Sequence, residues 1–476
     1  MTLPTHFSSR TGRFTRGLMR LTSRRGMIVA LAAASLIACQ NDLTLPNYNS
    51  ATVEGLAKDP AGLQLAATGV LVSERNNYGG YVRDITIFGR EGYYYFATDG
   101  RFVTDYLIGA GGALSPTGFA SGNWFGYFRN MRNAVNLVGA AEGSALPANQ
   151  KAAARGYANT FRALDMYYAL TLRDTLGIPI EILANPSDQS PFVSRGVAYT
   201  RISAILDSAK TDLAAAGGAA FPFLLHTGFA GFNTPATFLT FNRAIAARVL
   251  AVRGSLECGN ACYTLALTAV GESFAAPATS LADLNRGVYN VYSSAPGDAL
   301  NNLSTAADPN LVAHASFVAD VQKKADGTSD ARLGRKIAPL AAPRVGNPVS
   351  KSIPATQRFI GNSSNLAPTP IIRNEELLLI RAEANIRLGN VAAAMTDLNN
   401  VRTVSGGLPP LATATLDNLL YERRYSLILE GMRWIDARRF GRLSSLPLDL
   451  PSHFVAKVVP IPKAECDARD VKPNGC

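Results

Sequence analysis

The residues best suited to ligand chemistry lie between positions 75 and 120. This segment concentrates aromatic side chains among many glycines, with aspartates and arginines interspersed. An aromatic ring can stack on the apolar face of a sugar or peptide, while neighbouring charged groups hydrogen-bond its polar atoms. The segment therefore predicts ligand contact, with these candidates: Tyr78, Tyr81, Tyr93, Tyr94, Tyr95, Asp99 and Arg101. The alternative is that the rings pin an irregular loop onto the core, and for any single ring this is the simpler explanation.

Catalytic chemistry has little support in the sequence. Only four histidines occur, and His6 lies in the N-terminal segment. No G-x-S-x-G, H-E-x-x-H or phosphate-loop motif is present. Hydrolysis of a glycan needs two carboxylates that face each other across a cleft, and no spacing here points to such a pair. The sequence predicts a protein that binds its ligand without cleaving it and without a cofactor; an envelope hydrolase is the weaker alternative.

Four of the five cysteines form two close pairs, which are Cys258 with Cys262 and Cys466 with Cys476. In an exported protein an even number of cysteines indicates disulfides, and four cysteines allow three connectivities. Local pairing is the simplest of the three. A metal site is not predicted, because the only other soft ligands outside the N-terminal segment are three dispersed histidines.

A dense group of charges lies near the C-terminal end, at Glu422, Arg423, Arg424, Glu430, Arg433, Asp436, Arg438 and Arg439. Their spacing on two short predicted helices, about 416–430 and 432–440, favours a structural ionic network over a binding site. Such a network would lock the last helices onto the core, and each partner would be costly to remove.

The elements that position these residues are mainly helices. Helical periodicity predicts three hairpins, one from two helices in 151–216, one in 238–274 and one in 374–404. Their period resembles that of tetratricopeptide units. Gly389 is expected to end the first helix of the last hairpin in the left-handed conformation. The prediction is a mostly α fold with long irregular loops at about 75–120 and 285–370 and a few short strands.

The stretches IIRNEELLLIRAEANIRLGN and ERRYSLILEGMRWIDARRFG together resemble the SusD/RagB family of outer-membrane nutrient-uptake lipoproteins. The matching residues are Arg373, Glu376, Arg381, Ala382, Glu383, Ala384, Glu422, Arg423, Arg424, Leu427, Glu430, Gly431, Arg433, Asp436 and Arg439. Ser426 departs from the glutamate common at its position, which should weaken the ionic network slightly. The signature region covers residues 371–463.

The N-terminal residues 1–38 resemble a signal peptide. Six arginines precede the apolar run Met27–Ala38, and Leu36-Ile37-Ala38-Cys39 resembles a lipobox. Cys39 is thus the expected lipidation site, followed by a tether over 39–58, while the export route, Sec or twin-Arg, stays open. Outside this segment 40 basic residues face 35 acidic ones, a net charge of +5, without a basic block that would suggest nucleic acid as a partner.

Residues 59–476 are expected to form a single SusD-like α domain. The resemblance implies a lipid-anchored protein of the cell outer membrane that faces the exterior. It would capture an oligosaccharide or peptide and deliver it to a SusC-like TonB-dependent transporter. The alternative is a helical-repeat lipoprotein that acts as a protein–protein scaffold in the cell envelope.

Overall fold

The computed structural model describes residues 52–185, 187–296, 298–304, 310–347 and 352–476. The predicted signal peptide (1–38), the lipidation site Cys39 and residues 40–51 of the tether lie outside these residues. Within the described ranges, no helix is both long enough and apolar enough to span a bilayer.

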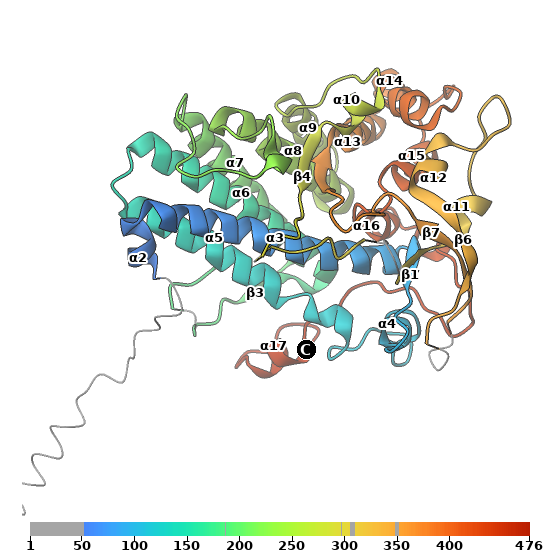
Figure 1. Ribbon diagram of the computed structural model, residues 1–476, viewed down its shortest axis with the longest axis horizontal. Coiled ribbons are helices and arrows are strands. Elements are labelled where there is room, and N and C mark those ends of the chain that lie inside the picture. Colours follow the sequence, from blue (N-terminus) through green and yellow to red (C-terminus); the bar gives the residue numbers. More distant parts are fainter. Residues whose placement is uncertain (1–51, 186, 297, 305–309, 348–351) are drawn as a thin grey trace, which may run out of the picture. The chain divides into compact units, whose positions relative to one another are not determined.

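Helices dominate the fold, as predicted (Figure 1). The helices that form the hairpins and pack beside them are α2 (Val53–Lys58), α3 (Pro60–Phe88), α5 (Phe125–Gly143), α6 (Ala148–Arg173), α7 (Arg195–Ala215), α8 (Pro235–Arg253), α9 (Asn260–Gly271), α13 (Asn374–Leu388) and α14 (Val391–Val401). Helix α6 packs against α7, α8 against α9 and α13 against α14, which confirms the three predicted hairpins. Helices α3 and α5 lie beside α6 and extend this array.

The ends of these helices follow from local sequence. The Asp59 side chain accepts a hydrogen bond from the backbone N–H of Ala61 and caps α3, where Pro60 occupies the first turn. Gly389 ends α13 with φ +80°, as predicted, because a glycine adopts this left-handed conformation without a steric penalty.

Strands are short and antiparallel. One sheet has the order β1-β5-β7-β6, from Gly92–Tyr94, Leu311–Ala313, Ala355–Phe359 and Ile337–Arg344. Two two-stranded sheets pair β2 (Ile178–Pro179) with β3 (Phe192–Val193), and β4 (Gly287–Asn290) with β8 (Thr369–Arg373). The predicted irregular region 285–370 therefore contributes most of the strands. The remaining short helices are α4 (Arg101–Val103), α10 (Leu281–Asn285), α11 (Ser316–Ala319), α12 (Ala331–Lys336), α15 (Leu416–Ser426), α16 (Arg433–Arg439) and α17 (Lys463–Asp467).

The predicted loop at 75–120 is wrong in its first part, because α3 continues to Phe88. Gly79 and Gly80 suggested a loop, but both lie inside the helix and allow close approach. A Cβ at Gly79 would collide with the side chain of Asn302, and one at Gly80 would lie 3.0 Å from the Asn123 carboxamide. These glycines serve packing, not chain reversal.

The last two helices are shorter than predicted. Helix α15 ends at Ser426 and α16 spans only Arg433–Arg439. Between them Leu429 and Gly431 adopt left-handed conformations, with φ of +59° and +71°. This turn replaces the last predicted turn of the first helix, and it directs the Glu430 side chain toward Arg373.

The core has two parts. The larger apolar cluster joins α3, α5, α6, α7 and α8 with the four-stranded sheet, and a smaller one lies between α13, α14 and α15. Two disulfides link Cys258 to Cys262, in the turn before α9, and Cys466 to Cys476, across the C-terminal tail. This is the local connectivity that the cysteine spacing favours.

Candidate functional site

Strand β1 sorts the tyrosines of the sequence Gly92-Tyr93-Tyr94-Tyr95-Phe96 into two groups. Successive side chains of a strand point to opposite faces. Tyr93 and Tyr95 stack on one another at 5.8 Å between ring centroids and are buried. Tyr94 and Phe96 lie on the other face with their centroids 6.4 Å apart, and Phe96 is 40% exposed. The alternation thus presents two of the aromatic rings to solvent.

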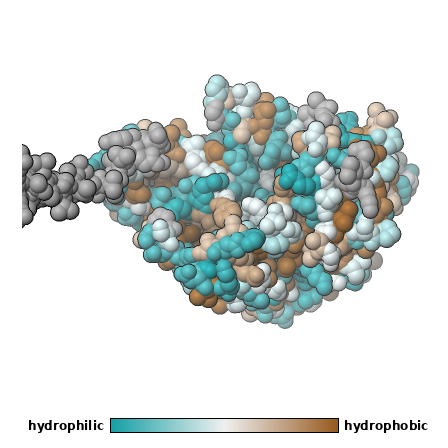
Figure 2. All heavy atoms as spheres, turned by 90° about the horizontal axis from the view of Figure 1, so that it is seen from below, coloured by the Kyte–Doolittle hydropathy of each residue, from teal (hydrophilic) through white to brown (hydrophobic). Residues whose placement is uncertain are grey.

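Four partly exposed rings form a group that we call the aromatic surface: Tyr94, Phe96, Phe102 and Phe119. Phe102, on α4, lies 4.4 Å from Tyr94 and 5.0 Å from Phe119, measured between centroids. Figure 2 shows the face on which α4 and α17 lie, and apolar residues are scattered over it among polar ones. The aromatic surface therefore offers rings for stacking within a mostly polar surrounding.

Charged groups frame these rings. The Arg101 guanidinium lies 4.1 Å from the centre of the Phe119 ring, and Arg83 lies 5.0 Å from that of Phe102. Arg101 also pairs with Asp99, with 2.6 Å between Nη2 and Oδ2. Hydrogen bonds from Arg101 lower the pKa of the Asp99 carboxyl. Asp99 is therefore an ionised acceptor beside an exposed donor, which suits recognition of hydroxyl or amide groups.

The structure brings together three of the seven predicted ligand contacts, Tyr94, Asp99 and Arg101. The other four are buried and are corrected here: Tyr78, Tyr81, Tyr93 and Tyr95. Phe96, Phe102 and Phe119 complete the aromatic surface but were not among the candidates. The period-2 pattern of β1 is the signal that could have selected Phe96 together with Tyr94.

The hydroxyl groups of three buried tyrosines serve the core. Tyr78 donates to the Pro370 carbonyl at 2.7 Å, and Tyr81 shares a hydrogen bond of 3.2 Å with Thr171. Burial raises the pKa of Tyr81 to about 12. The hydroxyl of Tyr93 donates to Asp449. In these three residues the ring and the hydroxyl are both used within the protein, so the simpler packing explanation holds for them.

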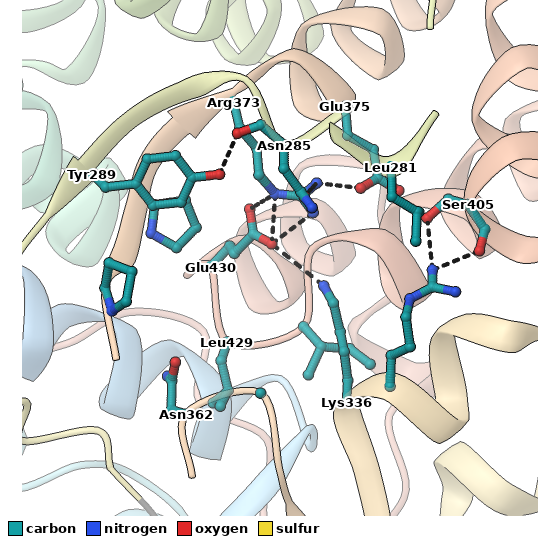
Figure 3. Close-up of a pocket in the computed structure, with 15 residues that line it drawn as sticks. Leu281, Asn285, Tyr289, Lys336, Asn362, Arg373, Glu375, Ser405, Leu429 and Glu430 are labelled. Carbon is teal, nitrogen blue, oxygen red and sulfur yellow. Dashed lines mark hydrogen bonds and ion pairs between the residues drawn. The ribbon is translucent and has the colours of Figure 1, made fainter. Parts of the chain in front are cut away.

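Most of the charged residues near the C-terminal end form buried ion pairs, as predicted. The guanidinium of Arg373 binds Glu430 at 2.8 Å and also contacts Glu375 (Figure 3). Burial alone would raise the pKa of Glu375, but Arg373 and Lys336 outweigh burial and lower this pKa to about 2. The pair holds the start of α13 against the turn that follows α15.

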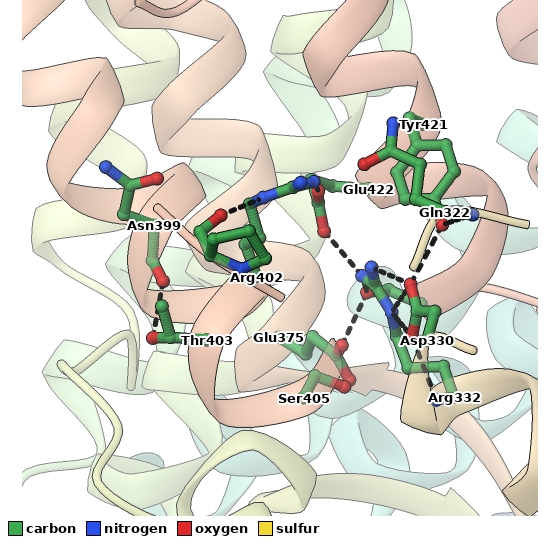
Figure 4. Close-up of polar contacts among 12 residues, drawn as sticks. Gln322, Asp330, Arg332, Glu375, Asn399, Arg402, Thr403, Ser405, Tyr421 and Glu422 are labelled. Atoms are coloured by element: carbon green, nitrogen blue, oxygen red, sulfur yellow. Dashed lines mark hydrogen bonds and ion pairs between the residues drawn. The ribbon is translucent and has the colours of Figure 1, made fainter. Parts of the chain in front are cut away.

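A second group is centred on Arg332, on α12 (Figure 4). Its guanidinium binds Asp330 and Glu422, each at 2.6 Å, and Glu422 also binds Arg402 at 2.7 Å. Ser426 accepts a hydrogen bond from Arg332 at 3.0 Å and donates to Glu375. The serine therefore bridges the two groups of charges at the position where the family commonly has a glutamate.

A third group ties α16 to α13. Arg439 binds both Glu383 and Asp436, and Asp436 also binds Arg423 at 2.7 Å. All four side chains are buried. The buried ion pairs connect helices, which agrees with a structural role, and the Arg373–Glu430 pair also lines a pocket.

The described residues contain no candidate metal centre. Across the described residues, no three His, Cys, Asp or Glu side chains are grouped so that they could hold a metal ion. His314 is bound on both ring nitrogens, to Ser316 at 2.7 Å and to Asp449 at 2.9 Å, so its ring is used within the protein.

Comparison with known proteins gives a consistent result. The model of the SusD family matches residues 338–470, which include most of these ion pairs. This match covers the C-terminal part of the chain. No curated protein sequence matches it. Solved structures share its fold at low identity, among them a SusD superfamily protein from Bacteroides vulgatus (TM-score 0.64, 14% identity, 88% of this chain and 99% of that chain). Another is NanU from B. fragilis (TM-score 0.60, 13% identity, 91% of this chain and 100% of that chain).

A third similar structure is surface glycan-binding protein A from Bacteroides thetaiotaomicron in complex with laminarihexaose. It has a TM-score of 0.64 and 14% identity over 88% of this chain and 100% of that chain. The family model begins at residue 338, whereas the aromatic surface lies at residues 94–119. The family match thus rests on the region with the ion pairs and carries no information on the rings.

Proposed function

We propose that this protein captures a glycan at the aromatic surface and delivers it to a TonB-dependent transporter of the outer membrane. The observation that carries the proposal is the set of partly exposed rings beside Asp99 and Arg101, on a SusD fold. A sugar ring stacks its C–H face on Tyr94 or Phe96, and its hydroxyls bind the charged pair. Binding is non-covalent, and no bond in the glycan is cleaved.

The site is an open surface and not a closed pocket, so it excludes little water. Affinity in the micromolar to millimolar range is expected, because only a fraction of the ligand surface is buried. A similar structure has been solved with laminarihexaose, which makes a glucan oligosaccharide the first ligand to test. Peptides belong in the same panel, because rings and charges also suit an extended peptide.

Anchoring completes the proposed role. Cys39 carries the lipid after removal of residues 1–38, and residues 39–58 tether the domain to the outer membrane. The protein then faces the cell exterior beside a SusC-like transporter. Support for this comes from the lipobox-like residues before Cys39 and from the family match.

Calorimetric titration of an oligosaccharide and peptide panel tests the proposal. Phe96→Ala removes a half-exposed ring that stacks on the ligand. The binding free energy should therefore weaken by roughly 1.4 kcal/mol, which raises Kd about tenfold. Phe125→Ala is a matched control, because Phe125 is 48% exposed on α5, outside the aromatic surface. Equal loss of binding in both variants, or unchanged binding in Phe96→Ala, would refute glycan capture at this surface.

A further inference from the structure

A pocket of about 470 Å³ opens beside the Arg373–Glu430 pair (Figure 3). It is lined by segments that are far apart in sequence, namely α10, β4, the end of α12, residues 361–370 and the turn at 428–430. Its volume is within the range of about 300–1,000 Å³ that is typical for small-molecule sites. It shares no residue with the aromatic surface, so it stands apart from the function proposed above.

One wall of the pocket is apolar and rigid. Tyr289 contributes an aromatic ring, held by a hydrogen bond from its hydroxyl to the Asn285 carbonyl, and Pro368 and Pro370 lie nearby. Leu429 lines the pocket with a left-handed backbone at φ +59°. Such a conformation costs a non-glycine residue roughly 1–3 kcal/mol and is kept only where the surroundings enforce it. The wall is therefore formed before any ligand binds.

The polar side of the pocket contains a group without a protein partner. Asn362 is only 8% exposed and lines the pocket, yet within the described ranges its carboxamide makes no hydrogen bond. Because Asn362 lines the pocket, its amide group can be satisfied there by water or by a ligand. Figure 3 shows Asn362 and Asn285 bordering the same space. Both amides can donate to and accept from hydroxyl groups.

The charges in the pocket do not balance. Arg373 is neutralised by Glu375 and Glu430, and Lys336 lies 3.4 Å from Glu430. Arg335, by contrast, is exposed and donates only to the carbonyl and hydroxyl oxygens of Ser405, at 2.6 and 3.3 Å. Counting the side chains that line the pocket, three cations face two carboxylates, and Arg335 is the cation for which the described residues provide no ion pair. The pocket thus has an excess positive charge, which lies on the guanidinium group of Arg335.

We propose that this pocket binds a sugar acid, that is, a pyranose ring that bears a carboxylate, such as glucuronate or galacturonate. Arg335 pairs with the carboxylate, Asn362 and Asn285 bind ring hydroxyls, and the apolar ring face packs on Tyr289. The carboxylate matches the planar guanidinium fork. The two amides and the aromatic wall favour a polyhydroxylated ring over a simple organic acid.

Titration of sodium glucuronate and sodium galacturonate, followed by NMR, tests this proposal, with glucose and galactose as neutral counterparts. The acids should bind in the millimolar range and at least about tenfold more tightly than the neutral sugars, since a hydrogen bond to a charged group contributes roughly 1.5–3 kcal/mol. Raising NaCl from 50 to 500 mM should weaken the binding of the sugar acids and leave the binding of the neutral sugars unchanged.

Variants locate the site. Arg335→Ala should remove the preference for the acids over the neutral sugars. Asn362→Ala should lower the affinity for acids and neutral sugars alike. Arg129→Ala is a matched control, because Arg129 is an exposed arginine on α5 that forms no ion pair in the described part of the chain. Phe96→Ala should leave binding of glucuronate unchanged, which separates this pocket from the aromatic surface. Equal affinity for glucose and glucuronate, absence of binding, or an unchanged Arg335→Ala variant would each overturn the proposal.

Discussion

Removal of Arg248 should destabilise the protein far more than removal of an exposed arginine. Arg248, on α8, binds the Glu376 carboxylate on α13 through Nε at 2.7 Å and Nη2 at 2.6 Å. Its Nη2 also donates to the Ile371 carbonyl at 2.6 Å. The two side chains are 5% and 1% exposed. Arg248→Met therefore leaves a buried carboxylate without its cation, which typically costs about 3–5 kcal/mol.

This cost can be converted into a melting temperature. An unfolding entropy of roughly 2.1 cal/mol/K per residue gives about 0.9 kcal/mol/K for the unit Thr52–Cys476. The Arg248→Met variant should thus melt about 3–6 °C below the parent protein in calorimetry. Glu376→Leu should cause a similar loss, because it leaves the buried guanidinium unpaired. The double variant should lose less than either single variant, since apolar replacement of a whole buried pair is often neutral.

The matched control is Arg442→Met. Arg442 pairs with Asp417 at 3.0 Å, but the two side chains are 49% and 79% exposed. Exposed pairs contribute about 0–1 kcal/mol, so the melting temperature should change by no more than about 1 °C. The reasoning fails if Arg248→Met and Arg442→Met have equal effects, or if the double variant loses the sum of the two single losses.

Two further predictions concern a buried carboxylic acid and a glycine in the left-handed conformation. Burial raises the pKa of Glu91 to about 8, only partly opposed by the attraction of nearby arginine and lysine side chains. The folded state therefore holds this proton more tightly than the unfolded state, and stability falls as pH rises from about 4.5 to 8. Glu91→Gln should melt higher than the parent protein at pH 8.5 and lose this advantage by pH 5, and a gain independent of pH would contradict the assignment. Gly431→Ala should lower the melting temperature, because φ is +71° there and a Cβ would lie 2.8 Å from the Tyr81 ring, whereas Gly218→Ala, which meets no atom within 4 Å, should not.

Patterns within short segments were read correctly from the sequence. The end of a helix at Gly389 and the three hairpins depend on neighbouring residues, and all are found in the structure. The charged residues at 422–439 were also interpreted correctly as structural, because their helical spacing already placed them toward the core. The loop predicted around Gly79 and Gly80 was wrong because it depended on residues that are distant in sequence. Whether a glycine ends a helix or packs inside it depends on a distant neighbour, here Asn302 or Asn123.

The sequence by itself determined the class of fold, the resemblance of its C-terminal region to the SusD family and the existence of an aromatic segment. Each of these is encoded in local periodicity or in a contiguous motif. Only the tertiary structure decided which rings reach solvent. Tyr93 and Tyr94 are adjacent and chemically identical, yet the pairing of β1 with β5 buries Tyr93 and leaves Tyr94 partly exposed. The pocket at Arg335 and Asn362 was likewise invisible in the sequence, because its walls come from segments spread between residues 281 and 430 that meet only after folding. Burial and unbalanced charge are properties of neighbours in space, and the order of residues along the chain does not specify those neighbours.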